Sequence, residues 1–107
     1  MPTPKRQCLF QAVVAVGRRC FYFGARAGHA DHIEPHNHGR GGPDTPENLV
    51  PACATCNCRK NDRALSPDLL AAAKQYAFIQ APLVNEIADS LFFANNIQTF
   101  PGLSFSN

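Results

Sequence analysis

The side chains between residues 29 and 63 are of the types that bind metals and move protons. Asp31 and His32 are adjacent, so in an extended segment they point to opposite sides of the strand. One of them can therefore hold a cation while the other accepts a proton, a task that suits histidine near neutral pH. Cys53 and Cys56 follow with a C-x-x-C spacing, which supplies half of a tetrahedral zinc site. Together these residues predict metal-dependent chemistry.

The elements that would position these side chains can be read from the surrounding sequence. Glycine and proline are concentrated between Pro35 and Pro46, which favours an irregular loop. The short apolar run 49–52 predicts a second strand returning beside the first, with Pro51 limiting its length. A short helix is expected after Cys56.

The order of these features resembles the HNH endonuclease family, on the residues Asp31-His32, the Gly-Gly loop, Asn48-Leu49-Val50 and Cys53-x-x-Cys56-Asn57-x-x-Lys60. The resemblance covers about a third of the chain. It implies an α+β fold: a small ββα-metal core, about residues 18–65, with flanking N-terminal and C-terminal helices. The expected organisation is a single domain over 1–107, in which about 66–107 form a helical extension.

The resemblance also implies a role for each matching residue. His32 would be the general base that takes a proton from the attacking water. Asp31 and Asn57 would be oxygen ligands of a catalytic Mg²⁺ or Mn²⁺, the ions that such ligands prefer. Asn48 would hold the loop and fix the orientation of the base. The middle and last letters of the motif are both asparagine here, so the motif is H-N-N.

Many members of the family hold a structural zinc with two C-x-x-C pairs. The later pair is present as Cys53 and Cys56, but in the earlier one Phe23 stands where the partner of Cys20 belongs. A structural zinc is nearly always bound by four protein ligands. Either Cys8 folds back to complete the site, or the zinc is absent and Phe23 fills the space by apolar packing. The number of cysteines, five, is odd, which argues against a complete disulfide framework. The expected location of the protein is therefore the reducing cytoplasm.

The formal net charge of the 107-residue chain is only +2, but the basic residues are unevenly placed. Seven of the ten lie between residues 18 and 63, namely Arg18, Arg19, Arg26, Arg40, Arg59, Lys60 and Arg63. This distribution is typical of a surface that binds a phosphate backbone, and a solvated basic face is the alternative. His29, His36 and His38 match no motif position and are interpreted as loop residues, with phosphate contact as the alternative.

Helices are expected on both sides of the core. Residues 7–16 predict an amphipathic helix that packs on the hairpin, and the apolar patch there is too short to span a bilayer. Ser66-Pro67-Asp68 predicts the start of a C-terminal helix, with Ser66 as its cap. Pro82 is expected to end that helix and start another. The phenylalanines near the C-terminus would cover the core or form a dimer surface.

The sequence thus predicts a metal-dependent endonuclease that hydrolyses phosphodiester bonds in DNA, with RNA not excluded as a substrate. One active site cuts one strand, so double-strand cutting would need a homodimer or two binding events. The alternatives are a non-catalytic zinc-knuckle module that binds nucleic acid, and a structural zinc protein that binds another protein through its phenylalanine-rich tail.

Overall fold

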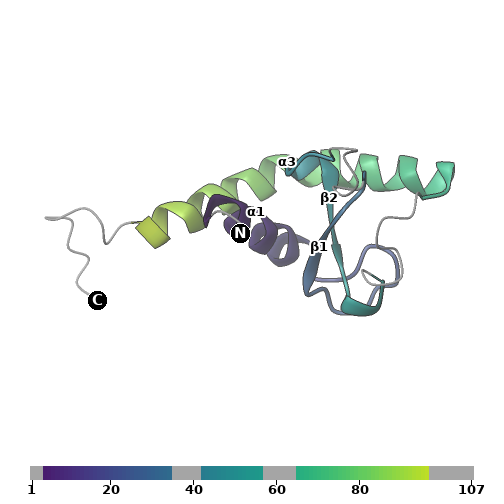
Figure 1. The fold of residues 1–107 in the computed structure, drawn as a ribbon, viewed down its shortest axis with the longest axis horizontal. Helices are drawn as coiled ribbons and strands as arrows, with labels where there is room; N and C mark the ends of the chain where they lie inside the picture. Colours follow the sequence, from purple (N-terminus) through teal and green to yellow (C-terminus); the bar gives the residue numbers. More distant parts are fainter. Residues whose placement is uncertain (1–3, 35–41, 57–64, 97–107) are drawn as a thin grey trace, which may run out of the picture.

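The fold is α+β, as expected: a two-stranded hairpin flanked by an N-terminal and a C-terminal helix (Figure 1). The computed structural model describes residues 4–34, 42–56 and 65–96. Its elements in chain order are α1 (Pro4–Gly17), β1 (His29–His32), the 3₁₀ helix η1 (Pro46–Asn48), β2 (Leu49–Ala52) and α3 (Pro67–Asn96). Residues 54–56 are helical and directly precede the undescribed 57–64.

The predicted hairpin is confirmed, and its two faces pack against different groups of side chains. β1 and β2 are antiparallel, with Asp31 opposite Val50 and His32 opposite Leu49. Leu49 packs with residues of α1 and of the C-terminal half of α3, whereas Val50 packs with residues of the N-terminal half of α3. All four residues of β2 are buried, so this strand lies at the centre of the protein.

The N-terminal helix α1 includes the predicted range 7–16 and extends beyond both ends of it. Its buried residues Ala12 and Val13 contact the core that contains Leu49, so the expected packing on the hairpin is confirmed. At its end the backbone approaches β2 closely: a Cβ on Gly17 would lie only 2.9 Å from the Cβ of Pro51. Glycine is therefore required there for steric reasons.

The C-terminal helix α3 begins as predicted, because the Oγ of Ser66 accepts the backbone N–H of Leu69 at 3.3 Å. The expectation that Pro82 ends this helix was wrong, since α3 continues through it to Asn96. Figure 1 shows α3 as one helix along the whole length of the described structure. Ala77, before Pro82, is buried in the core that contains Val50, and Val84, after it, is buried in the core that contains Leu49. This packing holds both halves, while Pro82 is exposed and water can satisfy the freed carbonyl.

The apolar side chains of α3 are only partly used for packing. The exposed large apolar side chains of this helix are Leu69, Phe78, Ile79, Leu83 and Phe93. Phe92 is half-buried, whereas Phe100 and Phe105 lie outside the described residues. Within the described ranges, no helix is both long and apolar enough to cross a membrane.

Candidate active site and metal centre

Asp31 and His32 point to opposite faces of β1, as their adjacency predicts. Asp31 is buried, and the hydroxyl of Tyr22 donates a hydrogen bond to its Oδ2 at 2.8 Å. Burial, and then the negative charge of Asp31, raise the pKa of Tyr22 far above its ordinary value, so its hydroxyl keeps its proton and remains a donor. A buried carboxylate requires such partners or a cation. The Tyr22 hydroxyl is one such partner for Asp31, and a carboxylate oxygen is also the kind of ligand that Mg²⁺ and Mn²⁺ prefer.

His32 lies on the face of the hairpin that is turned to α1. Its Nε2 is 2.6 Å from the Oδ1 of Asp44, and its ring meets that of Phe10 edge-on with centroids 5.8 Å apart. The side chain is 15% exposed, so it is partly shielded but not sealed in the core. A carboxylate on one ring nitrogen fixes the orientation of an imidazole, as in catalytic histidine–aspartate pairs.

Asn48 connects the two ends of the loop that carries Asp44. It is buried, and its Oδ1 accepts the backbone N–H of Glu34 at 2.9 Å. Its Nδ2 donates to the carbonyl oxygens of Pro43 at 3.0 Å and of Glu34 at 3.3 Å. The amide thus holds the residues on either side of the undescribed 35–41 and fixes the backbone next to Asp44.

Three thiols, one before the hairpin in the chain and two after it, form a second cluster. The Sγ atoms of Cys20, Cys53 and Cys56 all lie within 4.8 Å of one another. The backbone N–H of Cys56 donates to the Sγ of Cys53 at 3.4 Å, which closes a tight turn of the kind that C-x-x-C spacing allows. This bond lowers the pKa of Cys53, whereas the side-chain hydrogen bond with Cys53 raises that of Cys56 to about 12. A cluster of this size and chemistry fits three of the four ligands of a zinc ion.

Neither Phe23 nor Cys8 lies on the fourth side of this cluster. Phe23 is 78% exposed, so the expectation that it would fill the space by packing was wrong. The reason is a tight turn, in which Gly24 has a φ of 78° and donates its N–H to the carbonyl of Cys20 at 2.8 Å. This turn directs Phe23 to solvent. Cys8 is buried in α1 and its Sγ accepts from the Nδ2 of Asn95 at 3.6 Å, away from the three clustered thiols.

The predicted basic residues fall into two groups. Arg18, Arg19 and Arg26 are exposed and line one polar depression beside the end of α1. Residues 19 and 26 form a backbone bridge, which keeps these side chains together although seven positions separate them. The remaining predicted contacts, like the predicted cation ligand, lie outside the described residues: Arg40, Asn57, Arg59, Lys60 and Arg63. The same is true of His36 and His38, while His29 is exposed at the start of β1.

The hairpin, the thiol cluster and the beginning of the following helix lie within a segment that matches a known family. Residues 18–63 match the family model described as HNH endonuclease. This segment belongs to the HNH endonuclease family. The chain gives no significant match among curated proteins or solved structures. The HNH segment indicates nuclease activity in general, and the helices α1 and α3 lie outside it.

Several side chains in contact with the predicted site were not identified from the sequence. Tyr22 contacts Asp31, Asp44 contacts His32, and Arg6 contacts Asp44 through its Nε at 2.9 Å. Tyr22 follows Cys20 in a C-x-Y-x-G pattern, and this pattern could have identified Tyr22 from the sequence. Asp44 and Arg6 belong to no motif, and only the folded chain brings them to the histidine.

Proposed function

We propose that this protein is a metal-dependent endonuclease that hydrolyses phosphodiester bonds in DNA. One observation carries the proposal: within an HNH segment, Asp31 and His32 turn to opposite faces of β1, and each is held by its own partner. The buried carboxylate is suited to a cation and the partly exposed imidazole to a proton. A module that only binds nucleic acid has no need of this division.

In the proposed reaction His32 takes a proton from the attacking water. The water oxygen bonds to phosphorus while the bond from phosphorus to the 3′ oxygen breaks, and the leaving 3′ oxygen takes a proton from a solvent water. The products are a 5′-phosphate and a 3′-hydroxyl. Asp31, together with Asn57, would hold a Mg²⁺ or Mn²⁺. Such an ion stabilises the charge that develops on the phosphate and on the leaving oxygen.

The thiol cluster is proposed to bind a structural zinc. Cys20 precedes the hairpin, and Cys53 and Cys56 follow it, so an ion between them would tie the two ends together. This matters for the active site because Asn57 is the next residue after Cys56. Because one thiol has a raised pKa, zinc binding should release a proton from it.

The three exposed arginines beside α1 are proposed to contact the DNA backbone. Each guanidinium that neutralises a phosphate releases counterions, so binding should weaken with rising salt. A plot of the logarithm of the DNA-binding constant against the logarithm of salt concentration has a negative slope. Arg26→Gln should make this slope less steep by about one unit, whereas Lys74→Gln, on α3, should leave it unchanged. An unchanged slope for Arg26→Gln would show that Arg26 does not contact the phosphate backbone.

The proposal is tested by incubating supercoiled plasmid with the purified protein and Mg²⁺ or Mn²⁺. We expect nicking that EDTA abolishes and that His32→Ala slows by about 10²- to 10⁴-fold, the range that a general base contributes. His29→Ala is the matched control, since it removes an exposed histidine from the same strand. Plasmid binding without nicking would favour the zinc-knuckle binding module. Faster cleavage of RNA than of DNA would show that RNA, and not DNA, is the preferred substrate.

A further inference from the structure

The carboxylate of Asp44 lies between the proposed catalytic base and the N-terminal helix. Its Oδ1 is 2.6 Å from the Nε2 of His32, and its Oδ2 is 2.9 Å from the Nε of Arg6. The guanidinium carbon of Arg6 lies 4.8 Å from the centre of the Phe10 ring, and Phe10 in turn packs edge-on against His32. The imidazole is therefore held by side chains of the loop and of α1.

We infer that Asp44 is a positioning residue for His32, and that Arg6 and Phe10 make α1 part of the catalytic apparatus. The inference rests on the proposed nuclease function and adds residues that lie outside the HNH segment. Asp44 would keep the proton of the neutral imidazole on Nε2, so that the lone pair for the water proton lies on Nδ1. It would also stabilise the imidazolium that forms when that proton is taken, as the aspartate does in hydrolytic triads.

Two further contacts fix the carboxylate itself. Arg6 binds the oxygen that His32 does not use, which sets the rotation of the carboxylate. Asn48 holds the carbonyl of Pro43, the residue before Asp44, which sets the position of its backbone. The imidazole thus depends on a chain of contacts that begins in α1 on one side and in η1 on the other.

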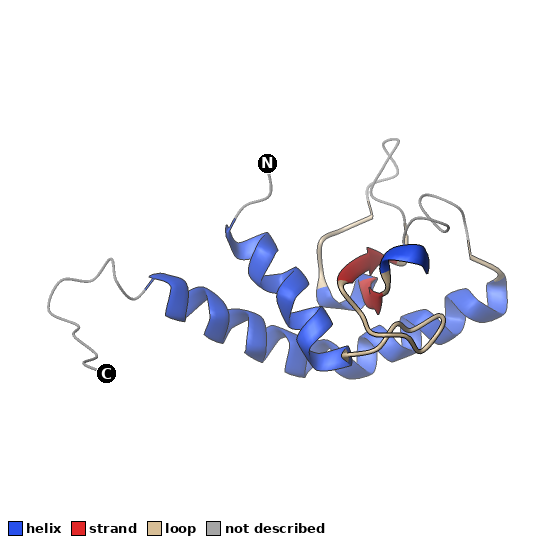
Figure 2. Cartoon of the chain, turned by 90° about the horizontal axis from the view of Figure 1, so that it is seen from below, coloured by secondary structure: helices blue, strands red, loops and turns tan. Residues whose placement is uncertain are grey.

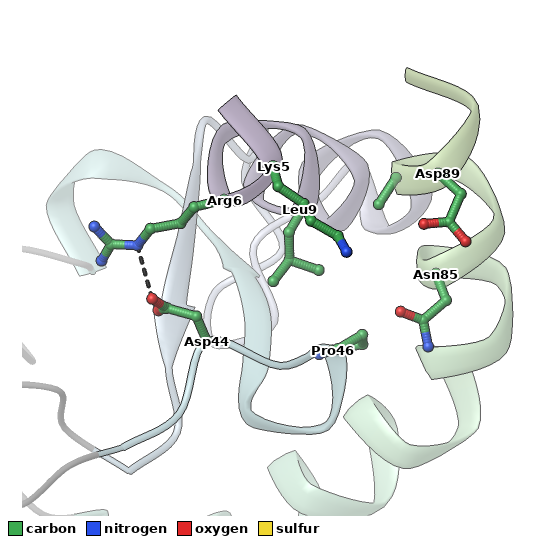
Figure 3. A pocket seen from close by; sticks show the side chains of 8 residues that line it. Lys5, Arg6, Leu9, Asp44, Pro46, Asn85 and Asp89 are labelled. Carbon is green, nitrogen blue, oxygen red and sulfur yellow. Dashed lines mark ion pairs between the residues drawn. The ribbon is translucent and has the colours of Figure 1, made fainter. Parts of the chain in front are cut away.

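Figure 3 shows the Arg6–Asp44 pair at one side of a pocket, with Asn85 and Asp89 of α3 at the opposite side. The pocket has a volume of about 370 Å³ and gives water access to the pair, whose side chains are 30% and 28% exposed. Solvent screening therefore limits what the ion pair adds to stability. The main effect of the Arg6–Asp44 pair should be on the orientation of His32. A positioning role therefore predicts a change in rate with little change in stability.

The test is a kinetic comparison of Asp44→Asn and Asp44→Ala with the wild type at saturating metal. The amide of Asp44→Asn can still accept a hydrogen bond but has lost the charge, and the alanine has lost both. We expect kcat to fall in that order, with a loss of about 10- to 100-fold for Asp44→Ala, the size found for residues that orient a ligand or base. KM should stay unchanged. Wild-type kcat in both variants, or losses confined to KM, would overturn the inference.

Arg6→Gln keeps the inference testable if Asp44 variants fold poorly. We expect a smaller loss of kcat than for Asp44→Ala, and none for Lys5→Gln, which removes the neighbouring charge from the same helix. Equal rates for Arg6→Gln and Lys5→Gln would show that α1 does not act on the base. A melting temperature for each variant shows whether a loss of rate simply follows a loss of folding.

A spectroscopic measurement reads the geometry without the reaction. In ¹⁵N spectra above the pH at which imidazoles are charged, the two ring nitrogens of His32 should differ strongly in the wild type, with the proton on Nε2. They should become more alike in Asp44→Ala, because the two tautomers then exchange. Identical spectra would contradict the inference. A wild-type protein that does not nick overturns the proposed function and this role together, whereas nicking that depends on His32 but not on Asp44 overturns only this role.

Discussion

Replacing Asn48 should destabilise the protein more than its single side chain suggests. The side chain is 6% exposed and makes three hydrogen bonds, to the backbone N–H and carbonyl of Glu34 and to the carbonyl of Pro43. Each bond contributes roughly 0.5–1.5 kcal/mol net, and groups left unpaired in the interior add to the cost. Asn48→Ala should therefore lower the free energy of unfolding by about 2–4 kcal/mol, a large share of the roughly 5–15 kcal/mol of a small domain.

Asn48→Asp distinguishes this explanation from a simple loss of packing. The aspartate keeps the size and the acceptor for Glu34 N–H, but it turns a carboxylate oxygen toward two carbonyl oxygens. It should therefore be at least as destabilising as the alanine. Urea unfolding at constant zinc content measures both, with Asn85→Ala, an exposed asparagine of α3, as the control. A change below about 0.5 kcal/mol for Asn48→Ala, or a more stable Asn48→Asp, would refute the reasoning.

Three other predictions concern the scaffold and the thiol cluster. Gly17→Ala should cost about 1–3 kcal/mol in urea unfolding, because the added Cβ meets the ring of Pro51; wild-type stability would contradict the close approach. Pro82→Ala should raise the melting temperature by restoring a backbone donor inside α3, and a lower value would mean that the proline is needed there. Cys20→Ser should lower the zinc content found by elemental analysis, and an unchanged content would exclude this thiol as a ligand.

Features set by short sequence spacing were predictable. The C-x-x-C turn, the cap at Ser66 and the alternation of Asp31 and His32 each depend on residues a few positions apart, and the structure contains all three. The hairpin followed from an apolar run bounded by a glycine- and proline-rich loop. In each case local geometry leaves few alternatives.

Features that depend on tertiary contacts were not predictable in this way. Proline usually ends a helix, but here the hairpin packs against residues on both sides of Pro82 and keeps α3 continuous. The pairing of Asp44 with His32 and Arg6 joins a loop, a strand and a helix, and no spacing in the sequence records it. The exposure of Phe23 likewise follows from a turn whose shape is set by Gly24.

Asp31 and His32, adjacent on β1, are proposed to do different work, and the dependence of nicking on metal concentration tests this division most directly. Asp31→Asn should raise the concentration of Mn²⁺ needed for half-maximal nicking, with the rate recovering as Mn²⁺ is added, because the variant holds the ion less tightly. His32→Ala should leave that concentration unchanged and lower the rate at every one. Variants that alter the same parameter, or that both nick like the wild type, would contradict the account.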